Sequence, residues 1–209
     1  MTPSKKTQKL GETAGQSTSS QNNSYVPGDR VIARRLISMT GESIAFPDPD
    51  RLIHLQFRRF AGCPICNLHL RPFIQRKAEL DAAGVQELIV FHSTAEELLQ
   101  NESDVPFPVI PDPDKLLYNE FRVGTSWRSV LDPGAMASVP RGAALALSRR
   151  FTIKAPLPLR PATNGRTGLP ADFLITTDSR VAAVKYGRHS GDSWSVDEVL
   201  ALASAEQHA

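Results

Sequence analysis

The two cysteines of the chain, Cys63 and Cys66, are separated by two residues, and this spacing is suited to chemistry. The 209-residue sequence contains only these 2 cysteines. Two thiols at this spacing can close a disulfide across the first turn of a helix, and they can also act as soft ligands for a metal ion. Redox chemistry is therefore the leading hypothesis, and metal binding is its alternative.

The segments on either side of the cysteines predict a strand-to-helix junction. Residues 52–57 form a short apolar run bounded by turn residues, which is typical of a buried central strand. Pro64 occupies the favoured first position of a helix, and this helix is expected to run to residue 83 with a kink at Pro72. The first cysteine would then precede the helix, and the second would lie one turn inside it.

This junction would make Cys63 the more reactive thiol. A thiolate attacks disulfides and peroxides, so the chemistry needs a lowered cysteine pKa. The unpaired N–H groups and the positive end of the helix dipole would lower the pKa of Cys63. Arg58 and Arg59 could add positive charge, although alternation along an extended chain points them in opposite directions. We expect Cys63 to attack and Cys66 to resolve the product as an intramolecular disulfide.

Two alternatives to redox catalysis follow from the same residues. Cys63, Cys66 and His69 follow one another at three-residue intervals and would spread over about 120° of a helical face, where they could hold zinc or copper. The sequence shows neither a fourth ligand nearby nor a second cysteine pair, which argues against a closed structural zinc site. The other alternative is a non-catalytic binding module, in which the long insertion makes the contacts and the cysteines remain only as small buried residues.

The composition indicates a soluble domain without a preference for nucleic acid or membranes. The sequence is 41% hydrophobic and 22% charged, which suits an ordinary core. Its net charge of +2 and pI near 8.6 are too mild to favour nucleic acid or a membrane surface. Residues 1–24 are polar, lack the apolar region of a secretory signal, and are expected to form a disordered tail. We therefore expect a cytoplasmic protein, in which a lone cysteine pair is more often catalytic or metal-binding than structural.

Residues 25–209 are expected to form one α/β domain with a long insertion. The pattern predicts hairpins at 31–46 (strands 31–37 and 43–46) and 169–186, a strand at 85–92 and an edge strand at 105–110. It predicts a helix at 115–121 and two helices that begin at capping boxes. One capping box is formed by Thr94 and Glu97, and the other, before the final helix, by Ser195 and Glu198. Residues 126–165 are rich in proline and glycine, and a connection this long is usually a functional lid or a disordered segment.

Three segments of the sequence resemble the peroxiredoxin-like AhpC/TSA group of the thioredoxin superfamily whose members carry two cysteines at this spacing. They are residues 58–66, 107–113 and 168–175. The resemblance implies a thioredoxin-like fold, in which helices flank a central mixed sheet. It also implies a thiol-dependent antioxidant or thiol–disulfide oxidoreductase that reduces protein disulfides or peroxides. Such an enzyme uses no bound cofactor, receives electrons from an external thiol reductant, and is compatible with a homodimer.

The resemblance also implies a substrate-binding segment, but the sequence departs from the family pattern, which has an arginine around the position of Pro170 and differs at two further positions given below. It implies a cis bond between Leu169 and Pro170 beside the cysteines, with the backbone of Leu169 pairing with an extended substrate. Typical peroxiredoxins have a proline seven residues and a threonine or serine three residues before the reactive cysteine. Gln56 and Phe60 occupy those positions here. The choice between disulfide and peroxide as the natural oxidant therefore stays open.

Overall fold

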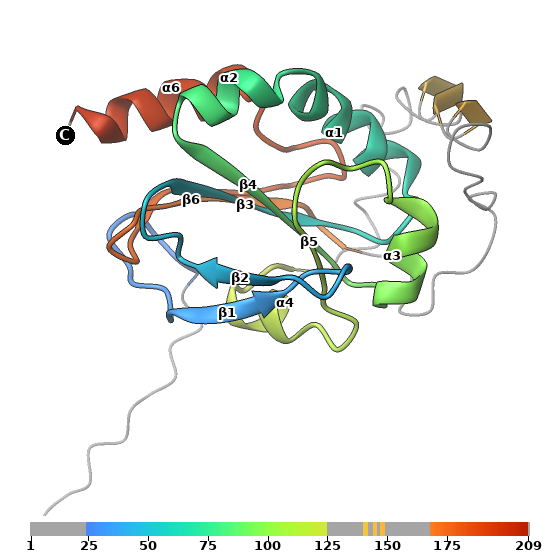
Figure 1. Cartoon of the computed structure of the whole chain (residues 1–209), viewed down its shortest axis with the longest axis horizontal. Helices are drawn as coiled ribbons and strands as arrows, with labels where there is room; N and C mark the ends of the chain where they lie inside the picture. The colour runs from blue at the N-terminus through green and yellow to red at the C-terminus, as the bar shows by residue number, and fades with distance from the viewer. Residues whose placement is uncertain (1–23, 125–139, 142–143, 146, 149–167, 209) are drawn as a thin grey trace, which may run out of the picture.

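A five-stranded mixed sheet forms the centre of the protein (Figure 1). The computed structural model describes residues 24–124, 140–141, 144–145, 147–148 and 168–208. The strand order is β5 (Val109–Pro111), β4 (Val85–Phe91), β3 (Leu52–Arg58), β6 (Ala171–Ile175) and β7 (Val181–Tyr186). The central strand β3 pairs in parallel with β4 and antiparallel with β6. The predicted central mixed sheet is confirmed.

Different elements cover the two faces of this sheet (Figure 1). On one face lie the helices α1 (Pro64–Gln75), α2 (Lys77–Ala82) and α6 (Val196–Gln207). On the other face lie α4 (Leu116–Glu120) and the antiparallel hairpin of β1 (Arg34–Ile37) and β2 (Ser43–Phe46). The predicted hairpin is confirmed. Helix α3 (Ala95–Asn101) contacts the edge strand β5.

Side chains of β3 alternate between two cores with different chemistry. Its odd-numbered residues from 53 to 57 are apolar and join the cluster on the hairpin side. His54, Gln56 and Arg58 are also buried but point to the helical side. The His54 ring lies 5.4 Å from the Phe73 ring of α1 and 5.7 Å from the Trp194 ring before α6. Since buried polar groups need hydrogen-bond partners, these three residues require a polar environment under the helices.

Two predicted capping boxes fix the starts of α3 and α6. The Thr94 hydroxyl accepts a hydrogen bond from the Glu97 N–H, and the Glu97 carboxylate accepts one from the Thr94 N–H. Ser195 and Glu198 form the same reciprocal pair at the start of α6. Such a pair satisfies two of the N–H groups that a helix leaves open at its start. Both capping boxes are confirmed.

The helix that follows the cysteines is shorter than predicted. The sequence predicts a helix to residue 83, but α1, which contains Pro72 as expected, ends at Gln75. The break falls at Arg76, whose φ of −105° and ψ of 21° leave the helical region, and α2 begins directly after it. The Pro72 carbonyl still accepts a hydrogen bond from the Arg76 N–H at 3.0 Å. The helix therefore continues for one turn after Pro72 and ends there.

The expectation of a cis bond between Leu169 and Pro170 is wrong. Among the described residues, the cis peptide bond precedes Pro47. The Leu169 N–H donates to the Gly124 carbonyl at 3.0 Å, and the Pro170 carbonyl accepts from the Gly187 N–H at 2.9 Å. Both backbone groups belong to the internal pairing around β6, so the Leu169 N–H cannot also pair with a substrate in this structure.

Two expected segments fall outside the part of the chain that the structure describes. The polar tail at 1–24 is described only at Ser24, and the insertion at 126–165 only at a few positions between 140 and 148. Within the described ranges, no helix is long and apolar enough to cross a membrane.

Candidate active site

Cys63 and Cys66 lie at the start of α1, as predicted. Cys63 is the N-cap residue, Pro64 is the first helical residue, and Cys66 lies in the first turn. The Cys63 carbonyl accepts a hydrogen bond from the Asn67 N–H at 3.0 Å, so the helical hydrogen-bond pattern begins at this cysteine. Both thiols are free, and their residues are only 1% and 3% exposed. The cysteine pair thus forms no disulfide in this structure and is largely enclosed.

The loop before the first cysteine is held by side chains from the neighbouring elements. The Ala61 N–H donates to the Ser93 hydroxyl at 3.0 Å, and the Gly62 N–H donates to a Glu102 carboxylate oxygen at 2.7 Å. Gly62 has a φ of +74°, and a Cβ atom there would lie 2.7 Å from Oδ1 of Asn101. Only glycine fits this conformation and this space without strain. These contacts hold the loop that leads into Cys63.

The two thiols have pKa shifts in opposite directions. Burial raises the pKa of Cys63, but a hydrogen bond from the Cys66 thiol, the positive charge of Arg59 and nearby backbone N–H groups lower it to about 7. Burial and the neighbouring Cys63 thiol raise the pKa of Cys66 well above that of an ordinary thiol. Cys63 therefore ionises first near neutral pH, and Cys66 holds its proton. This is the division that a nucleophile and a resolving thiol require.

The adjacent arginines serve different parts of the structure. Arg59 is 4% exposed, and its charge lowers the pKa of both thiols. The Arg58 guanidinium instead forms an ion pair with Asp172, with 3.0 Å between Nη2 and Oδ1, and donates to the Ser193 hydroxyl at 2.6 Å. The predicted divergence of the two side chains is confirmed, and Arg59 is the one that supports the cysteines.

Replacing Arg59 by methionine is expected to raise the pKa of Cys63 from about 7 towards the ordinary thiol value of about 8.5. Methionine keeps an unbranched apolar chain but removes the positive charge that stabilises the thiolate. The ultraviolet absorbance of the thiolate, followed across a pH titration, measures this change. Arg188, which is exposed, provides the matched control of the same substitution. An equal pKa in the Arg59→Met and Arg188→Met proteins would contradict the assigned role of Arg59.

A buried polar cluster beneath α1 and α6 was not predicted from the sequence. We define it as His54, Gln56 and Arg58 of β3, Glu87 of β4 and Asp172 of β6. His54 Nδ1 lies 2.9 Å from Glu87 Oε2, and His54 Nε2 lies 3.4 Å from Asp172 Oδ1. Gln56 donates to Glu87 and accepts from Arg58. Polar residues at every second position of a predicted buried strand were the signal that could have revealed it.

The acidic and basic side chains of this cluster stabilise each other's charged forms. Burial lowers the pKa of His54, but Glu87 and Asp172 raise it to about 9, so its imidazole is protonated at neutral pH. Burial raises the pKa of Asp172, but Arg58 and His54 lower it below its ordinary value. Since three strands contribute, the buried polar cluster ties β3 to both of its neighbours. It also fixes the loop before α6, where the Trp194 N–H donates to Asp172 at 3.2 Å.

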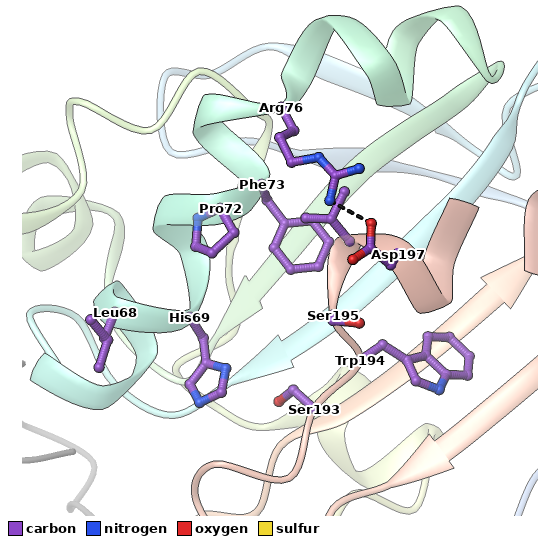
Figure 2. Close-up of a pocket in the computed structure, with 10 residues that line it drawn as sticks. Leu68, His69, Pro72, Phe73, Arg76, Ser193, Trp194, Ser195 and Asp197 are labelled. Atoms are coloured by element: carbon purple, nitrogen blue, oxygen red, sulfur yellow. Dashed lines mark hydrogen bonds and ion pairs between the residues drawn. The ribbon is translucent and has the colours of Figure 1, made fainter. Parts of the chain in front are cut away.

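His69, the third residue of the metal hypothesis, points into a groove between α1 and the start of α6 (Figure 2). The groove has a volume of about 300 Å³ and includes Phe73 and Trp194 in its wall. Burial, followed by the positive charge of Arg58, lowers the pKa of His69 to about 4. Within the described residues, no three His, Cys, Asp or Glu side chains are placed to hold a metal ion. The structure thus does not assemble the ligand set that the metal hypothesis needs.

The arrangement of this site is typical of one class of protein. A cysteine pair at the start of the helix that follows the central strand of a mixed sheet is the arrangement of thioredoxin-like proteins. The family described as AhpC/TSA antioxidant enzyme matches residues 73–189, more than half of the chain, and the chain belongs to this family. This match begins after the cysteines, so their roles depend on the geometry of the site. No curated protein matches the sequence significantly.

Solved structures of related proteins confirm the fold. Peroxidoxin BcpB from Mycobacterium tuberculosis aligns with a TM-score of 0.60 at 17% identity, covering 86% of this chain and 96% of its own. A mutant of peroxiredoxin 6 from Arenicola marina gives 0.62 at 14% identity, covering 88% and 74%. A putative thiol:disulfide interchange protein DsbE from Chlorobium tepidum gives 0.54 at 17% identity, covering 86% and 99%. The predicted thioredoxin-like fold is therefore confirmed, and identities this low extend the likeness no further than the fold.

Proposed function

We propose that this protein is a thiol-dependent oxidoreductase of the AhpC/TSA antioxidant type, with Cys63 as nucleophile and Cys66 as resolving cysteine. The observation that carries the proposal is the placement of two free, buried cysteines at the N-cap and in the first turn of α1. The opposite directions of their pKa shifts agree with it. Cys63 supplies the thiolate that attacks, and Cys66 keeps its proton until the first product has formed. Membership of an antioxidant enzyme family supports the same chemistry.

The proposed cycle accepts either of two oxidants and ends in the same state. With a disulfide, the Cys63 sulfur bonds to one substrate sulfur, and the other sulfur leaves as a thiolate that takes a proton. With a peroxide, Cys63 becomes a sulfenic acid, and the peroxide is reduced to an alcohol or water. Cys66 then forms the Cys63–Cys66 disulfide and releases the substrate thiol or water. An external thiol reductant restores both cysteines, so the cycle needs no bound cofactor.

Replacing Cys66 by serine is expected to stop the cycle after its first step. A serine hydroxyl cannot displace the intermediate, so Cys63 stays as a mixed disulfide after a disulfide substrate or as a sulfenic acid after a peroxide. Intact-protein mass spectrometry after one equivalent of oxidant, with a sulfenic-acid reagent present, identifies both species. The wild-type protein is the control and should instead lose two hydrogen atoms as its disulfide closes. Oxidation of the Cys66→Ser protein without any adduct on Cys63 would contradict the proposed roles.

A further inference from the structure

His92 follows the C-terminal end of β4 and is a buried imidazole with unused hydrogen-bonding capacity. It is 1% exposed, and neither Nδ1 nor Nε2 has a hydrogen-bond partner among the residues that the structure describes. The hydroxyl of Tyr118, whose ring lies 5.6 Å from the imidazole, donates to the Arg58 carbonyl instead. A buried polar group without a partner is costly, and such groups are found where a ligand or a reacting species completes the contact.

Arg59 connects this imidazole to the cysteine pair. The backbone N–H of His92 donates to the Arg59 carbonyl at 3.2 Å. A Cβ atom on Gly168 would lie 3.4 Å from His92 Nε2 and 3.6 Å from Arg59 Cγ, so the two side chains meet beside this glycine. The charge of Arg59 also lowers the pKa of Cys63, Cys66 and His92. The imidazole and both thiols therefore lie within range of the same positive charge.

The protonation state of His92 determines what it can offer a ligand. Burial lowers its pKa to about 4, and the positive charges of Lys115 and Arg59 act in the same direction, against Glu97. The imidazole is therefore neutral at neutral pH, with one N–H donor and one acceptor nitrogen. It leaves the Cys63 proton to solvent but can donate a hydrogen bond. A neutral donor beside a guanidinium suits an oxygen atom on which negative charge develops.

Enclosure of the nucleophile indicates the size of that ligand. Cys63 is 1% exposed, so a small molecule can approach its sulfur with less rearrangement than a disulfide on a folded protein. A hydroperoxide is small, and its cleavage produces the anionic oxygen that the two donors suit. We propose that His92, together with Arg59, binds the leaving oxygen of a hydroperoxide while Cys63 attacks. This inference rests on the proposed function, in which Cys63 is the nucleophile.

The proposed step uses only the thiolate and the peroxide. The Cys63 sulfur forms a bond to the terminal oxygen of R–O–O–H, the O–O bond breaks, and R–O⁻ leaves with the bonding electron pair. His92 donates a hydrogen bond to R–O⁻, and Arg59 balances the negative charge of R–O⁻. The alkoxide then takes up from solvent the proton that Cys63 released on ionising. The cysteine is oxidised by two electrons to the sulfenic acid, and the peroxide is reduced to R–OH. The Cys66 thiol then displaces water.

Stopped-flow oxidation of the reduced protein by two small oxidants tests this role of His92. In the His92→Leu protein, the rate constant with tert-butyl hydroperoxide is expected to fall about 100-fold, the usual effect of removing one oxyanion donor. The rate constant with 2-hydroxyethyl disulfide should change by less than about threefold, because no oxyanion forms in that reaction. His92→Asn keeps an N–H donor and should recover part of the peroxide rate. His69→Leu, the same substitution in α1, should leave both rates unchanged.

The ratio of the two rates separates a role in chemistry from a role in folding. Both rates come from one sample and are divided by the folded fraction from circular dichroism. Equal losses with both oxidants, or an unchanged peroxide rate in the His92→Leu protein, would overturn the inference. A wild-type protein that reacts with the disulfide but not with the peroxide would also overturn it and would leave the proposed function intact. Oxidation that persists in a Cys63→Ser protein would instead overturn the proposed function.

Discussion

Replacing Cys63 by serine is expected to lower turnover about 1000-fold or more with both a peroxide and a disulfide, since the nucleophile itself is removed. A serine hydroxyl does not ionise near neutral pH, so it cannot replace the thiolate. The wild-type rate should rise with pH through about 7, the pKa of Cys63, because only the thiolate attacks. Steady-state consumption of each oxidant, with dithiothreitol as reductant and the uncatalysed rate subtracted, measures both effects.

The Cys66→Ser protein is the matched control for this experiment. It has the same substitution three residues away, and in the absence of dithiothreitol it should still consume one equivalent of oxidant before it stops. The Cys63→Ser protein should consume none. Full activity of the Cys63→Ser protein in both assays would refute the enzymatic proposal, and a non-catalytic binding module would then be the better description.

The placement of the cysteines between a strand and a helix could be predicted, because the residues that indicate it are close together in the sequence. A short apolar run, a cysteine and a proline at the first helical position lie within 15 residues of one another, and each restricts the backbone where it occurs. The capping boxes of α3 and α6 are local in the same sense, and both are confirmed. The end of α1 was harder to predict, because a proline inside a helix does not determine at which residue the helix ends. Here α1 continues past Pro72 and ends at Gln75.

The buried polar cluster could not be assembled from local signals. His54 and Glu87 are 33 positions apart, and Arg58 and Asp172 are 114 positions apart. They meet only because β3 pairs with β4 and β6 in particular registers, and a shift of one residue would separate them. His92 raises the same difficulty, because its lack of a partner becomes visible only once the surrounding elements are in place.

The cis bond at Pro170 is the reverse case, a feature that was predicted but is absent from the structure. It came from the resemblance to a family and not from the residues around it. In this chain a Cβ atom on Gly187 would lie 2.8 Å from the Pro170 carbonyl oxygen and 2.6 Å from that of Asp192. The backbone around Pro170 is therefore tightly packed against the end of β7. A family motif can thus be kept in sequence while its surroundings give it a different local conformation.

Replacing Asp172 by alanine is expected to lower the free energy of unfolding by about 3–5 kcal/mol, the usual cost of removing one partner of a buried ion pair. Asp172 is fully buried and lies 3.0 Å from Arg58 and 3.4 Å from His54, so its loss leaves two buried cations with a single acidic neighbour, Glu87. The Trp194 N–H would also lose its acceptor. Urea denaturation at neutral pH, followed by circular dichroism, measures the change.

Asp178, in the turn between β6 and β7, is the matched control for this prediction. It forms an exposed ion pair with Arg180 at 3.0 Å, and both side chains are about half exposed. Water screens such a pair, so Asp178→Ala should leave the free energy of unfolding nearly unchanged. Equal losses in the two variants would show that the buried polar cluster does not stabilise the fold. A large loss confined to Asp172→Ala would establish that the charges beneath α1 and α6 help to hold the sheet on which both cysteines depend.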